Sequence, residues 1–438
     1  MIEVNLNNRK NFKTVLATVL TLGNLLVFSV LSSFSATIIS TTPELELLIE
    51  EALNNNHEIK SIVETIESYN DKGAFQGSLA DPKLGFALLN LPAESLSLDQ
   101  EAMTQKQVFV SQKFPWPGKR KLKTMQSSLE AERQMFLLKE KKLKTARKIA
   151  EAYYNLGLVS ESIKLNHELT QLIENLLNVA SAKYSSGRGL QQDIFKAQVE
   201  LSKFTDEKIQ LRKQYRVIEN KINAFLNRDN YKKITPPIGS DIDLHSFEMK
   251  TDYFKTLANK NNPTLGVLNS EIEKKNAMTL LAKKSQYPDF DIKLAYGQRD
   301  DDQSGRSRDD FISFSTALNI PLWKQSRQDK DIMSKKASER ASINRYKNFE
   351  KILPHRVEAT IVEIKEMIQS YKLYKKRLIP QSIQWAQSAV SDYEVGKTDF
   401  GTMINARIQP LKFELKAKKY LFEILKKRAE LEELTGGL

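Results

Sequence analysis

The sequence predicts an internally duplicated α+β membrane protein in which each chain contributes four strands to a β-barrel and carries long α-helices beyond it. Three observations support this fold class. The chain opens with basic residues and an uncharged apolar run, the same order of elements occurs twice, and short two-faced strands run into much longer helices. These features indicate an exported protein whose helices pack against one another rather than inside a globule.

Composition argues against several kinds of site. The chain has no cysteine, which excludes disulfides and thiolate metal sites, and its four histidines form no metal-binding spacing. Lysine and arginine outnumber aspartate and glutamate by 67 to 54, but the two signs are interleaved along helical patterns. Such mixing is typical of solvated helix faces rather than nucleic-acid-binding surfaces. We therefore expect no enzyme activity, no catalytic residue, no bound metal, no cofactor and no nucleic-acid partner.

Residues 1–36 have the pattern of a secretory signal peptide. Three basic residues precede a long uncharged apolar run, which ends in small residues. A cleavage site between Ser32 and Thr37 fits this pattern, and an uncleaved transmembrane anchor is the alternative. In either case the rest of the chain is expected outside the cytoplasm.

The remainder of the chain is predicted to form two structural repeats, 37–228 and 246–438, joined by a linker over 229–245. Three pairs of residues keep one separation of 206 positions (321 − 115, for example): Asn56 and Asn262, Pro82 and Pro288, and Pro115 and Pro321. Further along, Gly187 and Gly396 are 209 positions apart (396 − 187), so the second copy has gained a net three residues. An offset held over nearly the whole chain indicates an internal duplication.

Each repeat is expected to run helix, strand, loop, strand, long helix, turn, helix. In the first repeat the elements cover about 44–80, 83–91, 106–114, 118–184 and 190–228. In the second they cover about 246–286, 289–298, 310–320, 322–394 and 399–434. The β-hairpins therefore fall at 81–117 and 287–321, and the helical hairpins at 118–228 and 322–435.

The expected strands have one apolar and one polar face. In 106–114, Val108, Val110 and Phe114 alternate with polar residues, and 289–298 shows the same period of two. Strands of about ten residues with this pattern match the wall of a transmembrane β-barrel. The alternative is a half-buried sheet in a soluble α+β protein, but the adjoining helices are several times longer than such a sheet could cover.

The helix expected at 118–184 would be about 100 Å long at 1.5 Å per residue. Apolar residues recur along it every seven positions, including Leu129, Leu143 and Ala150. This spacing predicts packing against neighbouring helices, as in a coiled coil. The helix expected at 322–394 contains Pro354 and Pro380, so we expect kinks there.

Two short segments mark the change from strand to helix. The first seam consists of Pro115, Trp116, Pro117 and Gly118, and the second contains Pro321 and Trp323. Proline ends sheet pairing because it has no N–H to donate. Tryptophan is enriched at the interface between membrane and water. We therefore expect each seam to lie where a membrane β-barrel passes into the helical portion.

Four strands are too few to close a barrel, and an open sheet edge is not tolerated in lipid. The chain is therefore expected to oligomerise. Two copies would supply eight strands, and the interior of an eight-stranded barrel is filled by side chains. Three copies would supply a 12-stranded pore, continued by a tube of α-helices.

With these features the chain resembles the TolC-like outer membrane efflux proteins. The stretches "VSQKFPWPGKR" and "DPKLGF" are most similar to the heavy-metal and cation efflux branch, which is associated with RND-type pumps. The resemblance implies a homotrimeric exit duct in the cell outer membrane, with a large periplasmic portion. Its implied partners are a periplasmic adaptor and an inner-membrane pump, and its implied cargo is cations, heavy metals or small toxic compounds. A secreted or membrane-anchored structural coiled-coil protein is the alternative.

The resemblance also assigns roles to the tips of the two helical hairpins. In the family each tip carries a Tyr-x-x-Gly turn that faces the adaptor. The corresponding residues expected to meet the adaptor are Tyr184, Gly187, Arg188, Leu190, Tyr393, Gly396, Lys397 and Phe400. The glycines are expected to end their helices with a positive φ. Leu190 and Phe400 are expected to be exposed for a protein partner, the alternative being that they pack within their own hairpin.

A last set of residues corresponds to the periplasmic entrance. Six and nine residues after the second glycine, the best-known family member bears aspartates that ring the closed entrance. This sequence has Thr402 and Asn405 there, and Asp193 at the matching place in the first tip. It therefore departs from the family's anionic gate in the second tip.

Overall fold

The computed structural model describes residues 42–237 and 250–437. The expected signal peptide at 1–36 and part of the expected linker lie outside the described residues. Within the described ranges, no helix is both long enough and apolar enough to cross a membrane.

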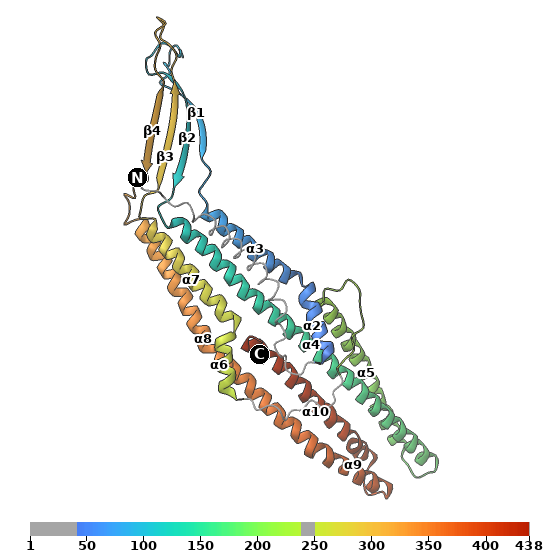
Figure 1. Ribbon diagram of the computed structural model, residues 1–438. Coiled ribbons are helices and arrows are strands. Elements are labelled where there is room, and N and C mark those ends of the chain that lie inside the picture. The colour runs from blue at the N-terminus through green and yellow to red at the C-terminus, as the bar shows by residue number, and fades with distance from the viewer. Residues whose placement is uncertain (1–41, 238–249, 438) are drawn as a thin grey trace, which may run out of the picture. The chain divides into compact units, whose positions relative to one another are not determined.

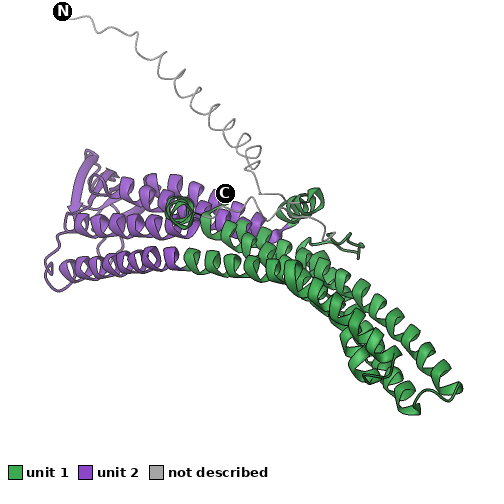
Figure 2. Cartoon of the chain, turned by 90° about the horizontal axis from the view of Figure 1, so that it is seen from below, with its two compact units in different colours: residues 1–55, 143–261, 356–438 green, residues 56–142, 262–355 purple. Residues whose placement is uncertain are grey.

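The chain forms two compact units, which Figure 2 colours separately. Unit 1 comprises residues 1–55, 143–261 and 356–438, and unit 2 comprises residues 56–142 and 262–355. Each unit takes segments from both halves of the chain, so neither unit is one of the expected repeats. The boundaries of the repeats stay a prediction.

Unit 2 contains a four-stranded antiparallel sheet in the order β1-β2-β3-β4 (Figure 1). Its strands are β1 (Lys83–Leu89), β2 (Gln105–Phe114), β3 (Phe290–Gln298) and β4 (Phe311–Leu318). Each half of the chain supplies one hairpin, and the hairpins join where β2 pairs with β3. The outer strands, β1 and β4, pair on one side only within the described part of the chain.

The register of the sheet collects apolar side chains on one face. Two neighbouring rows across the four strands are Leu84, Val110, Leu294, Phe314 and Phe86, Val108, Tyr296, Ile312. These side chains are between 47% and 79% exposed. A half-buried sheet in a soluble protein would cover its apolar face. The uncovered face therefore favours the barrel wall over that alternative.

Asparagine residues break the helices expected at 44–80 and 246–286, which corrects the prediction. Asn56 separates α2 (Pro43–Asn55) from α3 (His57–Gly77), and Asn262 separates α6 (Thr251–Asn261) from α7 (Pro263–Lys284). Asn56 Oδ1 accepts hydrogen bonds from two backbone N–H groups, and Asn262 Oδ1 accepts one at 2.9 Å. An asparagine side chain that binds backbone donors in this way starts a new helix.

The two long helices differ in continuity. As predicted, α4 (Lys119–Ser185) is one uninterrupted α-helix of 67 residues. The prediction of one helix over 322–394 is wrong about where the helix starts and about its being a continuous α-helix. The helix begins at Gln328 and consists of α8 (Gln328–Leu373), a π-helical segment η2 (Tyr374–Leu378) and α9 (Ile379–Glu394).

Pro380 accounts for the π-helical segment. Proline lacks an N–H, and its ring collides with the carbonyl four residues earlier, here that of Lys376. The wider π turn avoids this clash, because the N–H of Ile379 donates to the carbonyl of Tyr374, five residues earlier. Pro354 lies inside α8 without changing its helix type. Of the two prolines, only Pro380 therefore changes the type of helix.

Unit 1 also contains α5 (Gln191–Phe225) and α10 (Phe400–Thr435) (Figure 1). Apolar clusters hold its helices together, and two of them lie among the described residues. One includes the buried Tyr153 and Phe422, and the other includes the buried Ile173, Phe204 and Phe400. Both clusters combine side chains from the two halves of the chain, so the hairpins of the two halves pack together in each of them.

Candidate functional site

The two hairpin tips share one backbone geometry. The first tip (residues 184–193) joins α4 to α5, and the second tip (residues 393–402) joins α9 to α10. Gly187 has a φ of 71° and Gly396 a φ of 74°, and a Cβ on either would meet nothing within 4 Å. The positive φ, rather than lack of space, therefore requires glycine. This confirms the expected turn conformation.

Backbone hydrogen bonds close the two turns in the same way. The N–H of Arg188 donates to the carbonyl of Lys183 at 2.9 Å, and the N–H of Lys397 donates to that of Asp392 at 2.8 Å. Both bonds span five residues and end a helix in the Schellman pattern. The two tips are therefore alike up to this point in the chain.

The next helix starts differently in the two tips. In the second tip Asp399 caps α10 and accepts hydrogen bonds from the N–H groups of Gly401 at 2.8 Å and Thr402 at 3.0 Å. The equivalent residue of the first tip is Leu190, which has no side-chain capping bond. Leucine at this position forgoes about 1 kcal/mol of helix stability relative to a capping residue. The first tip thus keeps an apolar residue where a polar one would stabilise its helix.

The exposure expected for Phe400 is wrong. Phe400 is 2% exposed, its ring lies 5.5 Å from that of Tyr393, and it packs with Ile173 and Phe204 of the first hairpin. Leu190, in contrast, is 60% exposed. The apolar surface expected on both tips is thus buried at Phe400 and accessible at Leu190.

The two turn tyrosines also differ. Lys183 Nζ lies over the Tyr393 ring at 3.9 Å from its centre, and burial, aided by the charge of Asp193, raises the pKa of Tyr393. Tyr184 is exposed.

On the first hairpin, Phe195 and Val199 lie one helical turn apart on α5 and line a hollow of about 550 Å³. Phe195 and Val199 were not among the residues predicted from the sequence, although apolar residues four positions apart share one face of a helix.

The first seam is tied to the start of β3. Trp116 stacks on Tyr287 and Phe290, with ring centres 5.0 Å and 5.7 Å away. The backbone N–H of Trp116 and the ammonium of Lys119 donate to the Asp289 carboxylate at 2.9 Å and 2.7 Å. Burial of Asp289 opposes its ionisation, but these two donors prevail and lower its pKa. Gly118, with a φ of 90°, then turns the chain into α4.

Within the described part of the chain, the second seam makes no such ring stack or ion pair. Trp323 is 71% exposed, and its neighbour Leu322 is also exposed. Pro321 is half-buried between β4 and the turns that precede α8. The two seams, similar in sequence, therefore have different surroundings.

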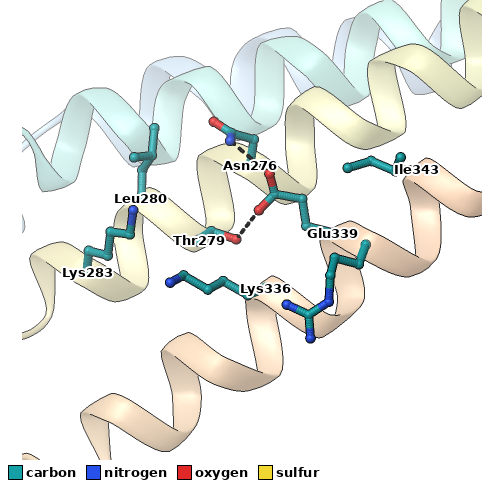
Figure 3. A pocket seen from close by; sticks show the side chains of 8 residues that line it. Asn276, Thr279, Leu280, Lys283, Lys336, Glu339 and Ile343 are labelled. Carbon is teal, nitrogen blue, oxygen red and sulfur yellow. Dashed lines mark hydrogen bonds between the residues drawn. The ribbon is translucent and has the colours of Figure 1, made fainter.

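A cavity between α7 and α8 (Figure 3) contains the carboxylate of Glu339 among Lys283, Lys336 and Arg340. Asn276 and Thr279 donate to this carboxylate at 3.0 Å and 2.9 Å. The hydrogen bond from Asn276 is the main cause that lowers the pKa of Glu339. An ionised carboxylate committed to two donors on the facing helix joins the helices and is poorly suited to proton transfer.

Neither a protein-family model nor a curated protein sequence matches this chain. Solved structures match it along almost its whole length. The outer-membrane channel OprN aligns with a TM-score of 0.76 and 14% identity, covering 91% of each chain. CusC aligns with a TM-score of 0.75 and 12% identity, over 92% of this chain and 96% of its own. The Campylobacter jejuni CmeC outer membrane channel aligns with a TM-score of 0.74 and 13% identity, over 90% and 86%.

The chain has the TolC-like fold. The likeness includes both the four-stranded antiparallel sheet and the long helical hairpins, because about nine-tenths of the chain aligns.

The residues predicted to line the periplasmic entrance, Asp193, Thr402 and Asn405, have different surroundings within the TolC-like fold. Thr402 is exposed and its hydroxyl donates to Asp399 at 2.5 Å, while Asn405 is exposed on the next turn of α10. Asp193 is half-buried, and burial, together with repulsion from Asp399, raises its pKa against the effect of Lys196. The acidic residue of the second tip that contacts a predicted entrance residue is thus Asp399. The sequence signal for it was an aspartate directly ahead of an apolar helix.

Proposed function

We propose that this protein is the outer-membrane exit duct of a tripartite efflux system, with a large periplasmic portion. An inner-membrane RND-type pump and a periplasmic adaptor deliver the substrate, and the duct conducts it passively to the exterior without catalysis of its own. The observation that supports this most is the sheet, which has an exposed apolar face and two open edges in a chain with the fold of solved outer-membrane channels. Open edges in lipid leave backbone groups without hydrogen-bond partners. Further copies are therefore needed.

The proposed assembly is a homotrimer. Three copies provide 12 strands if β4 of one protomer pairs with β1 of the next. Two copies would provide eight, and the interior of such a barrel is filled by side chains. The face opposite the apolar one carries Ser111, Lys293 and Ser315. In the trimer this polar face lines the conducting pore.

The proposed cargo is cations, heavy metals or small toxic compounds. This part rests on the similarity of the stretches around Pro82 and Pro115 to the heavy-metal and cation efflux branch. Selection of the substrate belongs to the pump, because a passive pore accepts what is delivered to it. Susceptibility of a deletion strain to metal salts and to organic toxicants separates the two groups of cargo.

The proposed docking surface for the adaptor lies on the hairpin tips, and mainly on the first. Tyr184 and Leu190 are exposed there, whereas Tyr393 is half-covered and Phe400 is buried. Leu190 also replaces a capping residue at a cost to helix stability, which is reasonable for a residue that serves a partner. Arg188 and Lys397, both exposed beside the glycines, flank this surface.

Site-specific crosslinkers test the docking surface. A photo-crosslinker at Arg188 should capture the adaptor in cells more efficiently than one at Lys397. As a control, the same crosslinker at Glu414, midway along α10, should capture little. Capture at Glu414 without capture at either tip would place the adaptor on the flank of the helices and refute docking at the tips.

Membrane fractionation and conductance test the function as a whole. The protein should be recovered with outer membranes, shift in gel mobility on heating, and conduct ions in a planar lipid bilayer. A secreted or membrane-anchored coiled-coil protein would show neither the heat shift nor the conductance. That outcome would overturn the duct.

A further inference from the structure

A cavity of about 600 Å³ lies at the first seam, where β2 ends and where β3 and α4 begin. Phe114, Trp116 and Phe290 form its aromatic wall, and Arg120 and Lys121 lie on its helical side. Trp116 is fixed in place by stacking on Tyr287 and Phe290. The cavity thus combines a rigid aromatic surface with two cations.

The sheet register places this cavity on the apolar side of the sheet. Phe114 pairs directly with Phe290, and along the alternating strands these residues share a face with Val110 and Leu294. That face is the exposed apolar one, which contacts lipid in the proposed function. The aromatic wall therefore continues the lipid-facing surface at the end that passes into the helices.

The charges at the start of α4 are incompletely balanced by the protein. Three cations, Lys119, Arg120 and Lys121, open the helix, and its first turn has no acidic residue. Lys119 is paired with Asp289, whereas Arg120 and Lys121 are exposed and have no carboxylate within ion-pair distance among the described residues. The positive end of the helix dipole disfavours cations at this position. An anion between Arg120 and Lys121 would offset both charges.

We propose that this cavity binds the phosphodiester headgroup of an anionic membrane phospholipid. The phosphate is held by Arg120 and Lys121, the glycerol region lies against Trp116, and the acyl chains extend along the apolar face of the sheet. Arginine matches phosphate oxygens in a bidentate way, and basic residues beside membrane-spanning segments recognise anionic headgroups. This inference rests on the proposed function, because it requires the apolar face to lie in a bilayer.

The second seam provides a matched control within the chain. Lys324 and Arg327 are exposed cations in the corresponding segment, but Trp323 beside them is 71% exposed and does not stack on an aromatic wall. The position equivalent to Arg120 is Ser326, 206 residues later (326 − 120). Neutralising Lys324 and Arg327 removes the same charge from the same end of the sheet without touching the cavity.

Native mass spectrometry of the protein released from detergent micelles tests the proposal, with phosphatidylglycerol as the probe and phosphatidylcholine as the uncharged comparison. The wild-type trimer should retain three phosphatidylglycerol molecules, one per protomer, and should retain phosphatidylcholine much less. Arg120→Gln/Lys121→Gln should weaken retention about 25-fold, because each basic residue contributes about a factor of five. Lys324→Gln/Arg327→Gln should retain the lipid as the wild type does.

Three outcomes would overturn the lipid site. The first is equal retention of phosphatidylglycerol and phosphatidylcholine by the wild type. The second is an equal loss of phosphatidylglycerol in the two double variants. The third is complete release of the lipid by millimolar inorganic phosphate, which would indicate a site for free phosphate. The comparison of the two lipids on the wild-type protein needs no variant, so it tests the lipid site even if Arg120→Gln/Lys121→Gln does not fold. The same spectra report the oligomer. A protomer that binds phosphatidylglycerol selectively without forming trimers would support the lipid site and refute the trimeric duct.

Discussion

The two hairpin tips have the same backbone and different side-chain surfaces. Gly187 and Gly396 have nearly equal φ values, and equivalent hydrogen bonds close the two turns. Beyond the turn, Asp399 caps its helix, whereas Leu190 leaves the equivalent helix without a side-chain cap and is exposed. The turn therefore depends on one glycine, while the side chains around it differ between the two tips. The less stabilising choice, Leu190, marks the tip with the stronger indication of a partner.

The long helices of the two halves differ in a related way. α4 runs without interruption, while its counterpart contains the π-helical segment before Pro380. A π turn holds one more residue than an α turn. The two long helices nevertheless hold the same number of residues, because α8, η2 and α9 together span residues 328–394. The net gain of three residues in the second half therefore lies in the turns between Pro321 and the start of α8.

Tryptophan substitutions should give the largest difference between the halves. Trp116→Asp removes an interfacial anchor and its stack on Tyr287 and Phe290, and places a carboxylate beside Asp289. Trp323→Asp removes an anchor that makes no such stack. We expect assembled protein in the outer membrane to fall severalfold with Trp116→Asp and less with Trp323→Asp. Normal yield of both variants, measured on unheated gels of outer-membrane extracts, would contradict the placement of the seams.

Truncation of the two apolar tip residues should affect stability very differently. Phe400→Ala deletes a ring from the core and should lower the free energy of unfolding by about 3–5 kcal/mol. Leu190→Ala should change it by less than about 0.5 kcal/mol, because Leu190 is exposed. Chemical denaturation followed by circular dichroism measures both. Equal losses would mean that Leu190 packs within its own hairpin.

The sequence could predict the elements that depend on neighbouring residues. The alternating strands, the prolines at the seams and the glycine turns all act within a few positions. Burial of Phe400 was not predictable in this way, because its partners Ile173 and Phe204 lie about 200 positions earlier. The stack of Trp116 on Tyr287 is likewise a contact between the two halves.

Some missed features did have local signals. Asn56 and Asn262 interrupt helical patterns with a residue that caps helices, and could have been interpreted as helix starts. Pro380 was interpreted as a kink, yet it produces a π-helical segment, because surrounding contacts decide how a helix relieves a proline clash. Asp399 precedes an apolar helix as a capping residue does.

Adding a cap to the first tip and removing the cap of the second should change the stability of their helices in opposite directions. Leu190→Asn supplies a cap to α5 and should stabilise that hairpin by about 1 kcal/mol. Asp399→Ala removes hydrogen bonds to Gly401 and Thr402 and should destabilise α10. Despite its greater stability, Leu190→Asn should reduce efflux in cells, since it removes exposed apolar surface from the first tip. A variant with higher stability and full efflux would show that Leu190 is not needed for docking.

Unit 2 should show a small loss of stability in acid that depends on Glu130. Burial of Glu130 opposes its ionisation, but Arg133 at 2.5 Å and Lys274 at 2.6 Å prevail and lower its pKa to about 2. A carboxyl whose pKa is lower in the folded than in the unfolded state contributes stability at neutral pH. This contribution is lost as the pH falls from about 4.5 toward 2. The thermal midpoint should fall over that range, and less steeply in Glu130→Gln. Equal slopes would contradict a stabilising role for this ion pair.

The number of chains in the purified particle is the most direct test of the trimeric duct, and the mass of the protein in detergent gives that number. Analytical ultracentrifugation, with the bound detergent subtracted, gives the number of chains in the particle. Because one chain offers four strands with open edges at β1 and β4, we predict a stable particle of three chains. A stable monomer or dimer that keeps its secondary structure would contradict the trimeric duct.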